Sequence, residues 1–212
     1  MSPPSSPPFP IVLASGNAHK AREIAEGLAI RGLPVQLETA LGYARMADCV
    51  EDGATFRANA YRKAHFLRPF APATAWVLAD DSGLEVDVLG GAPGVRSARF
   101  AGEDASDADN RALLLARLRE HPDPAARIAR FRCHFALLPP ATDGPGGYDC
   151  EGTVEGHLLA AERGEGGFGY DPLFVPAGES RTFAEMEPAR KDRLSHRGRA
   201  LDALTAWLRQ RP

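Results

Sequence analysis

A short polar loop near the start of the chain has the composition of a phosphate-binding site. Its residues are Ser15, Gly16, Asn17, Ala18, His19 and Lys20. The loop lies between an apolar run at residues 11–14 and a helical pattern that begins near Ala21. Small residues at such a junction direct backbone N–H groups and the positive end of a helix toward one point, and Lys20 adds a full charge. These features favour an anion such as phosphate, although a plain turn with Ser15 or Asn17 as helix cap fits them equally well.

Adjacent carboxylates follow a second apolar run, residues 76–79, which predicts a buried strand. The residues that come next are Asp80, Asp81, Ser82 and Gly83. Because α/β folds place their chemistry at strand ends, one of the two carboxylates can hold a divalent cation there. A turn in which Asp80 and Ser82 cap backbone N–H groups is the alternative. Glu51 and Asp52 add carboxylates ahead of a predicted helix, where a solvated helix start explains them equally well.

A glycine-rich stretch at residues 164–169 matches the G-x-G-x-x-G dinucleotide fingerprint in its letters but not in its context. That fingerprint follows a strand and opens a helix, whereas a turn into a strand, residues 171–175, follows this stretch. We therefore expect no nicotinamide site. The glycines allow a tight loop in which Phe168 and Tyr170, on either side of Gly169, could stack on a base. A loop without a ligand is the alternative.

Basic residues gather at the start of the last predicted helix. Lys191 precedes the segment Ser195-His196-Arg197-Gly198. Cations at a helix N-terminus oppose the helix dipole, so Arg197 in the first turn indicates a ligand that is anionic or rich in hydrogen-bond acceptors. A capped surface helix with solvated basic residues is the alternative. The phosphate loop, the carboxylate pair, the aromatic loop and this basic helix start are four clusters that we consider together as one candidate site.

Apolar periodicity predicts an α/β chain whose element junctions carry these clusters. The expected strands are residues 11–14, 35–37, 76–79, 84–89, 131–138, 153–159 and 173–175. The expected helices are residues 21–30, residues 56–70, a helix capped by Ser106 or Asp107 that ends before Pro122, and a last helix from Ser195 through Leu208. The sequence contains no internal repeat and no domain linker.

The composition limits the class of protein. The chain has 212 residues, of which 44% are hydrophobic and 25% charged, which fits one globular domain or one domain with two lobes. A formal net charge of −3 gives no global reason to expect a nucleic acid partner. Three cysteines without C-x-x-C spacing indicate neither a disulfide framework nor a zinc site, and suit a reducing cytoplasm. We expect a soluble protein without a membrane span, disordered over residues 1–10 and folded over residues 11–212.

Five motifs, in order along the chain, resemble those of the inosine triphosphatase family, which acts on non-standard purine nucleoside triphosphates. They are Ser-Gly-Asn-x-x-Lys at 15–20, Ala-Asp-Asp-Ser-Gly-Leu at 79–84, Gly-Gly-Ala-Pro-Gly-Val at 90–95, Gly-Gly-Phe-Gly-Tyr-Asp at 166–171 and Ser-His-Arg-Gly at 195–198. The resemblance implies a homodimeric, Mg²⁺-dependent enzyme that cleaves ITP, dITP and XTP to the monophosphate and pyrophosphate. It also implies an elongated mixed sheet with flanking helices and two lobes around a central cleft.

The resemblance also assigns roles to residues. Glu51 and Asp81 would position Mg²⁺, and Asp81 is the family's assigned proton acceptor. The implied substrate-binding residues are Ser15, Gly16, Asn17, Ala18, His19, Lys20, Lys63, Ser82, Phe168, Gly169, Tyr170, Asp171, Lys191, His196 and Arg197. Many relatives have glutamate where this chain has Ala58. Any support that this glutamate gives to the metal region is therefore missing here or supplied by another group.

Hydrolysis between the α- and β-phosphates needs an oriented water, a base and neutralisation of charge on the leaving pyrophosphate. Mg²⁺ and Lys20 can supply the neutralisation, and Mn²⁺ would fit the same carboxylates. A carboxylate bound directly to the metal is a poor base, so Asp81 orients a water or Asp80 replaces it as base. Donors from His196 and Arg197 would favour a 6-oxo purine over adenine. Stacking on Phe168 adds affinity without selectivity.

Two other functions remain open from the sequence alone. A related pyrophosphatase for modified pyrimidine or methylated nucleotides would use the same phosphate and metal residues. A non-catalytic nucleotide-binding module would keep the pocket without turnover. A panel of nucleotides that differ in the base separates the first alternative, and ligand binding without pyrophosphate release would indicate the second.

Overall fold

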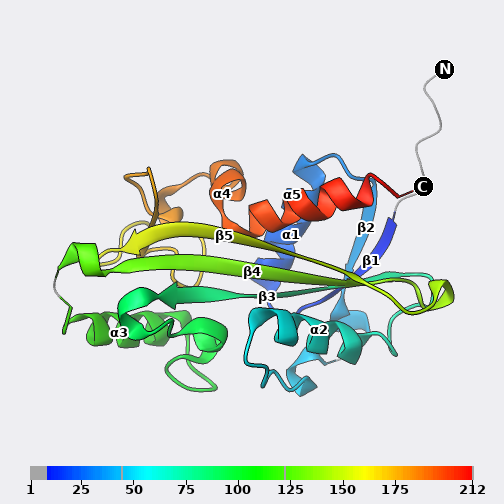
Figure 1. Ribbon diagram of the computed structural model, residues 1–212, viewed down its shortest axis with the longest axis horizontal. Helices are drawn as coiled ribbons and strands as arrows, with labels where there is room; N and C mark the ends of the chain where they lie inside the picture. The colour runs from blue at the N-terminus through cyan, green and yellow to red at the C-terminus, as the bar shows by residue number, and fades with distance from the viewer. Residues whose placement is uncertain (1–8, 44, 122, 212) are drawn as a thin grey trace. The chain divides into compact units, whose positions relative to one another are not determined.

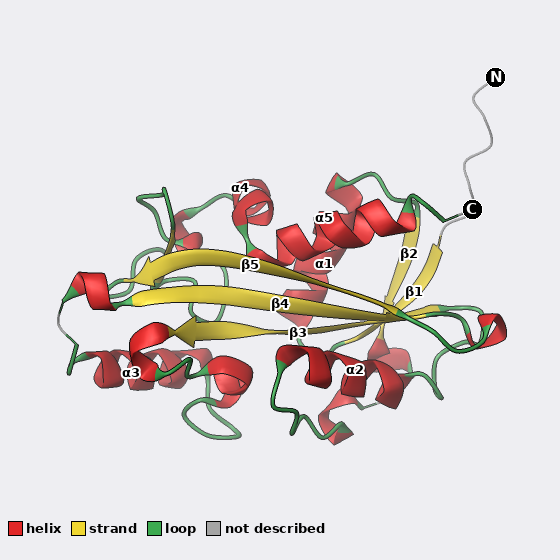
Figure 2. Ribbon diagram, in the orientation of Figure 1, coloured by secondary structure: helices red, strands yellow, loops and turns green. Residues whose placement is uncertain are grey.

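The structure is a computed structural model that describes residues 9–43, 45–121 and 123–211 (Figures 1 and 2). Its strands are β1 (Phe9–Ala14), β2 (Val35–Thr39), β3 (Trp76–Val86), β4 (Ile128–Leu138), β5 (Tyr148–Leu158) and β6 (Phe174–Pro176). Its α-helices are α1 (Ala18–Ile30), α2 (Phe56–Leu67), α3 (Asp107–Leu118), α4 (Pro188–Leu194) and α5 (His196–Leu208). Among the described residues, no helix has the length and apolar character needed to cross a membrane.

The strands form one mixed sheet in the order β2-β1-β3-β4-β5-β6. β1 pairs in parallel with both β2 and β3, whereas β5 and β6 pair antiparallel. The predicted α/β class with a mixed sheet and flanking helices is therefore confirmed. The chain divides into two compact units, and β3, β4 and β5 contribute residues to both of them.

The first unit contains residues up to 81, residues 134–151 and residues from 200 onward. β1 reads as a continuous apolar run at residues 11–14 because it pairs in parallel with a strand on each side and these four residues are buried. Ala60 and Ala64 of α2, four residues apart, are fully buried and allow the helix to approach the sheet closely. The core residues of this unit include Val12, Ala14, Ala60, Ala64, Leu67, Val77, Ala79, Ala136 and Leu138.

The second unit contains residues 82–133 and 152–199. Its core is richer in aromatic side chains, and Phe131 packs edge-on against Phe174 with ring centroids 4.8 Å apart. β5 approaches β6 closely at Gly156, where a Cβ would lie 2.3 Å from the carbonyl oxygen of Val175. The core includes Leu84, Val86, Leu114, Leu118, Phe131, Val154, Leu158, Leu173, Phe174 and Phe183.

The structure corrects the prediction of two strands at residues 76–79 and 84–89. One strand, β3, runs without interruption from Trp76 to Val86, and a 3₁₀ helix follows at Asp87–Leu89. The acidic pair therefore lies inside a strand rather than in a turn after it. Aspartate is disfavoured in strands, but here Lys20 and Lys63 form ion pairs with these carboxylates, and that tertiary contact outweighs the local preference.

Several helix and strand ends also differ from the predictions. α1 begins at Ala18, so the last three residues of the predicted loop form its first turn, and α2 ends at Leu67 instead of residue 70. Of the predicted disordered segment at residues 1–10, residues 1–8 lie outside the described residues. Phe9 and Pro10 open β1, where they pair with Val35 and Gln36 of β2.

A partly exposed polar cluster in the first unit joins α2 to β4 and β5. The carboxylate of Asp149 accepts hydrogen bonds from Arg57 Nε at 3.0 Å and from the Tyr61 hydroxyl at 2.9 Å. His134 Nε2 lies 2.9 Å from the same carboxylate. The hydrogen bonds from Arg57, Tyr61 and His134 outweigh the effect of burial and lower the pKa of Asp149 to about 2. The ionised carboxylate therefore stabilises this unit.

We expect Asp149→Asn to lower the free energy of unfolding by about 1–2 kcal/mol at pH 7. The folded-state pKa is depressed below the ordinary value near 3.9, so the stabilisation is present above about pH 4 and is lost as the pH falls toward 2. Urea titrations at pH 7, 5, 4 and 3 measure the difference. The gap between the two proteins should narrow below pH 4, and the exposed Asp143→Asn serves as control. A gap that is constant with pH would contradict this account.

Candidate active site

The phosphate-loop residues form the start of α1 in the first unit. Asn17 is the helix cap, because its Oδ1 accepts hydrogen bonds from the N–H groups of His19 at 2.9 Å and Lys20 at 3.1 Å. Ser15 Oγ accepts from the N–H of Asn17 at 3.1 Å. The Lys20 ammonium lies 3.1 Å from Oδ2 of the buried Asp80. Asn17 thus caps the helix, as the alternative prediction of a capped turn proposed. The carboxylate of Asp80 pairs with the Lys20 ammonium at the same junction.

A buried lysine joins the predicted metal-binding carboxylates. Lys63 Nζ, which comes from α2, donates to Asp81 Oδ1 at 2.7 Å and to Glu51 Oε2 at 2.9 Å. Lys63 and Asp81 are both 6% exposed. Burial alone would lower the pKa of Lys63, but attraction by the neighbouring carboxylates outweighs it and raises that pKa. Burial raises the pKa of Asp81, and the cations Lys63 and Lys20 oppose this rise.

The donor set of this centre fits a divalent cation that is shared with a ligand. Asp81 Oδ2 is buried and accepts no hydrogen bond from the described residues. Within residues 9–43, 45–121 and 123–211, no group of three His, Cys, Asp or Glu side chains forms a metal site alone. Mg²⁺ commonly takes one or two carboxylates and completes its shell with water and substrate phosphates. Asp81 and Glu51 would supply that number of protein ligands.

Asn59 supports the segment that carries Glu51, and the sequence patterns did not single it out. Its side chain is fully buried, and its Oδ1 accepts from the N–H of Gly53 at 2.8 Å. A Cβ at Gly53 would lie 2.5 Å from that oxygen, so only glycine fits there. The signal that could have identified Asn59 is an amide side chain on the alanine-rich face of α2, since a buried amide needs a hydrogen-bonding partner.

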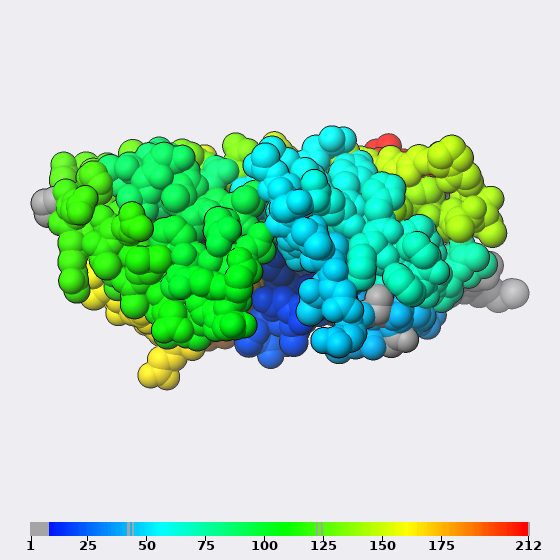
Figure 3. All heavy atoms as spheres, turned by 90° about the horizontal axis from the view of Figure 1, so that it is seen from below, coloured from blue at the N-terminus to red at the C-terminus, as the bar shows by residue number. Residues whose placement is uncertain are grey.

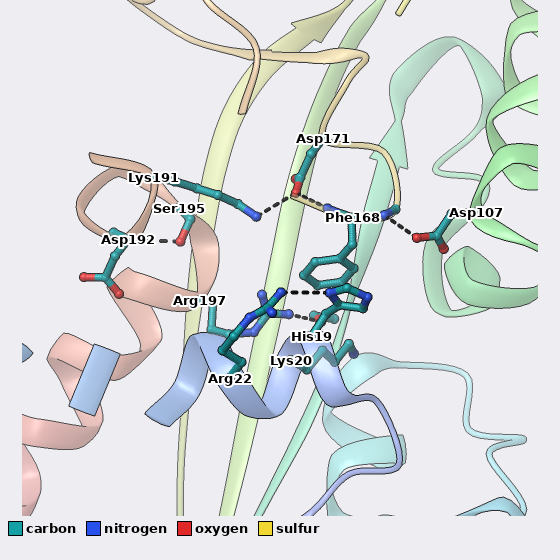
Figure 4. Close-up of polar contacts among 12 residues, drawn as sticks. His19, Lys20, Arg22, Asp107, Phe168, Asp171, Lys191, Asp192, Ser195 and Arg197 are labelled. Carbon is teal, nitrogen blue, oxygen red and sulfur yellow. Dashed lines mark hydrogen bonds and ion pairs between the residues drawn. The ribbon is translucent and has the colours of Figure 1, made fainter. Parts of the chain in front are cut away.

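The glycine-rich loop at residues 166–171 in the second unit is organised by Asp171. Asp171 Oδ2 accepts from the N–H of Phe168 at 2.8 Å and from Lys191 Nζ at 2.6 Å (Figure 4). Gly167 has φ +71°, and a Cβ there would lie 2.1 Å from the same oxygen. Lys191 Nζ also lies 5.1 Å from the centroid of the Phe168 ring. The loop therefore brings an aromatic ring and a buried, neutralised cation together.

Tyr170 departs from its predicted role as a stacking surface. Only 4% of the residue is exposed, and its hydroxyl donates to the carbonyl oxygen of Ser97 at 2.9 Å. Burial raises the pKa of this hydroxyl, and the negative charge of Asp107 adds to the rise. The side chain packs in the core of its unit and anchors the loop there. Phe168 is therefore the loop's candidate for base stacking. Phe168 and Tyr170 are two positions apart in the loop, so the sequence pattern could not show which of them is buried.

The start of α5 is buried, which corrects the alternative of a solvated basic surface helix. Arg197 is 3% exposed and His196 is 5% exposed. Arg197 Nη2 donates to Ser82 Oγ of β3 at 2.9 Å, and the His196 ring stacks on Phe131 with centroids 4.8 Å apart. Ser195 Oγ accepts from the N–H of Gly198 at 3.0 Å and caps the helix. A buried guanidinium that is tied to Ser82 can read hydrogen-bond acceptors of a ligand.

Comparison with known proteins decides the family. The model of the Ham1 family matches residues 11–207. The chain belongs to the Ham1 family. The dITP/XTP pyrophosphatase of Vibrio vulnificus (strain YJ016) is 45% identical over 202 residues, which cover 95% of this chain and 98% of that protein. The protein of the same name from Syntrophobacter fumaroxidans is 46% identical over 208 residues, which cover 95% of this chain and 85% of the relative.

Solved structures of Ham1 proteins share the fold. The HAM1 protein from Coxiella burnetii superposes with a TM-score of 0.80 at 39% identity, over 96% of this chain and 100% of that one. The Ham1 protein of Staphylococcus aureus gives a TM-score of 0.78 at 33% identity, over 95% and 98% of the two chains. The relatives named dITP/XTP pyrophosphatase confirm the resemblance that the five sequence motifs indicated.

Proposed function

We propose that this Ham1 protein hydrolyses dITP, ITP and XTP to the nucleoside monophosphate and pyrophosphate, and so removes damaged purines from the nucleotide pool. The observation that carries the proposal is near full-length similarity, at 45% identity, to proteins named dITP/XTP pyrophosphatase. The buried Lys63–Asp81 pair supports it, because costly buried charges are expected where chemistry is done. We further propose a cytoplasmic homodimer without nucleic acid or membrane partners, as the family resemblance and the composition imply.

The first unit provides the phosphate-directed chemistry. Asp80 keeps the Lys20 ammonium in place, and a bound triphosphate can replace Asp80 as the partner of that ammonium. Asp81 orients the attacking water, and Asp81 or its neighbour Asp80 takes the proton. The water oxygen bonds to the α-phosphorus as the bond from that phosphorus to the bridging oxygen breaks, and pyrophosphate leaves with the bridging oxygen. Lys63 keeps Asp81 in position and remains protonated. Mg²⁺, held by Asp81 and Glu51, would neutralise charge on the departing pyrophosphate.

The second unit provides the base-directed contacts. Phe168 offers an aromatic face, and the residues Arg197 and His196 offer N–H donors. Hypoxanthine and xanthine carry a 6-oxo acceptor, whereas adenine carries a 6-amino donor that would oppose such a donor. Sites built on this contrast discriminate by roughly 10⁴ or more. Asp171 and Lys191 hold the loop that presents Phe168.

The test measures pyrophosphate release with Mg²⁺ from ITP, XTP, dITP, GTP, ATP and dTTP, with modified pyrimidine and methylated nucleotides added to the panel. We expect turnover of the 6-oxo non-standard purines and a loss of at least about 10²-fold in Asp81→Asn, because a general base contributes 10²–10⁴-fold. Asp52→Asn, an exposed acid near Glu51, is the matched control and should keep full activity. Release only from modified pyrimidine or methylated substrates, or binding without turnover, would refute the proposal.

A further inference from the structure

We infer that Asp107 and Arg111 of α3 are positioning residues that hold the Phe168 loop in the conformation needed to stack on a purine base. The inference rests on the proposed function and extends it to residues outside the five motifs. α3 belongs to the second unit, as the loop does, and Figure 3 shows this part of the chain, in green, at the molecular surface. Asp107 is exposed and Arg111 is half-buried, and neither belongs to the apolar core of the unit.

Both polar backbone groups of Gly169 are bound by α3. Asp107 Oδ2 accepts from the Gly169 N–H at 2.7 Å, and Arg111 Nη1 donates to the Gly169 carbonyl oxygen at 2.9 Å. Residues four apart lie on the same face of a helix, so one face of α3 presents an acceptor and a donor to a single residue. Figure 4 shows the Asp107 bond ending on the backbone beside Phe168.

The loop needs such a clamp because packing does not determine the conformation at Gly169. This residue has φ +60°, and no atom lies within 4 Å of the position where a Cβ would be. Glycine is the residue that loses most conformational freedom on ordering. On the preceding side, Asp171 already holds the N–H of Phe168. Asp107 and Arg111 hold the following residue, so the backbone of Phe168 is fixed at both ends.

Helix capping does not account for these contacts. Ser106 caps α3, and Asp109 completes the capping box by accepting from the Ser106 N–H at 2.9 Å. An acid at the first position, as Asp107 is, also favours the helix dipole, but the dipole does not explain the bond from Arg111 to the loop. Arg111 is itself oriented by Glu162, whose Oε1 lies 2.9 Å from Arg111 Nε.

The experiment compares Asp107→Ala and Arg111→Met with the unaltered full-length chain. We expect KM for ITP to rise about five- to twentyfold, with kcat within twofold, because the loop must then be ordered by the substrate itself. The Kd for inorganic tripolyphosphate, which has no base, should stay unchanged. Asp107→Asn keeps an acceptor oxygen and should restore most of the affinity, and Arg117→Met on the exposed side of α3 should have no effect.

Amide hydrogen exchange in the absence of nucleotide gives a readout that does not depend on turnover. Segment 164–171 should exchange at least fivefold faster in Asp107→Ala and Arg111→Met than in the unaltered chain. Unchanged exchange, or equal weakening of ITP and tripolyphosphate binding, would overturn the inference. If the unaltered protein does not hydrolyse ITP, the proposed function fails, and the exchange data still decide whether α3 orders the loop.

Discussion

Lys63→Met should lower the free energy of unfolding by about 3 kcal/mol and remove measurable turnover. Lys63 is 6% exposed and binds two carboxylates, so its loss leaves the buried Asp81 charge uncompensated. Removing one partner of a buried ion pair typically costs 3–5 kcal/mol, and we take the lower end because the Glu51 side chain is 28% exposed. Urea denaturation gives the stability, and pyrophosphate release from ITP gives the activity.

Two further variants make this result specific. Arg62→Gln removes the neighbouring cation of α2, whose ion pair with Asp52 is solvent-exposed, and should cost less than about 1 kcal/mol. The double variant Lys63→Met/Asp81→Asn removes the orphaned charge together with its partner and should regain most of the lost stability, but no activity. If Lys63→Met and Arg62→Gln lower the free energy of unfolding equally, Lys63 and Asp81 are not a coupled pair. The same conclusion follows if the double variant is no more stable than Lys63→Met.

The sequence predicted the fold class better than the bounds of its elements. The α/β class followed from apolar runs such as residues 11–14 and 76–79, and these runs are indeed strands. The predicted strand ended before Asp80 and Asp81 because strand propensity takes no account of Lys20 and Lys63, which come from other parts of the chain. Only the folded structure pairs these charges, so the continuity of β3 could not be derived from local sequence.

Other contacts of the candidate site are non-local or depend on burial, which periodicity does not reveal. Tyr170 and Phe168 are two residues apart in an irregular loop, so nothing in the sequence shows that one is core and the other is not. Asp107 and Arg111 look like ordinary helix-surface charges until Gly169, about sixty positions away, is placed against them. The sequence motifs therefore pointed to candidate ligand contacts, whereas the contacts that position them could be found only in the folded structure.

Arg197→Ala should reduce discrimination between ITP and ATP more than any other single change. Arg197 is 3% exposed and its guanidinium donates to Ser82, so it can face the base with little reorganisation. We expect kcat/KM for ITP to fall about 10²–10³-fold, because a charged hydrogen bond to a buried acceptor is worth several kcal/mol at most. We expect kcat/KM for ATP to change less than threefold. Steady-state kinetics with both nucleotides measures the ratio.

Arg199 supplies the matched control for this prediction. It lies two residues further along α5, is exposed, and donates from Nη1 to the carbonyl oxygen of Thr153 at 2.7 Å. Arg199→Ala removes the same charge from the same helix, so an effect of net charge or of the α5 dipole would appear equally in both variants. Ser82→Ala should give a smaller loss of the same kind, since it only frees the guanidinium. Equal losses on ITP and ATP in Arg197→Ala would mean that Arg197 supports catalysis or folding, and that another group recognises the 6-oxo position.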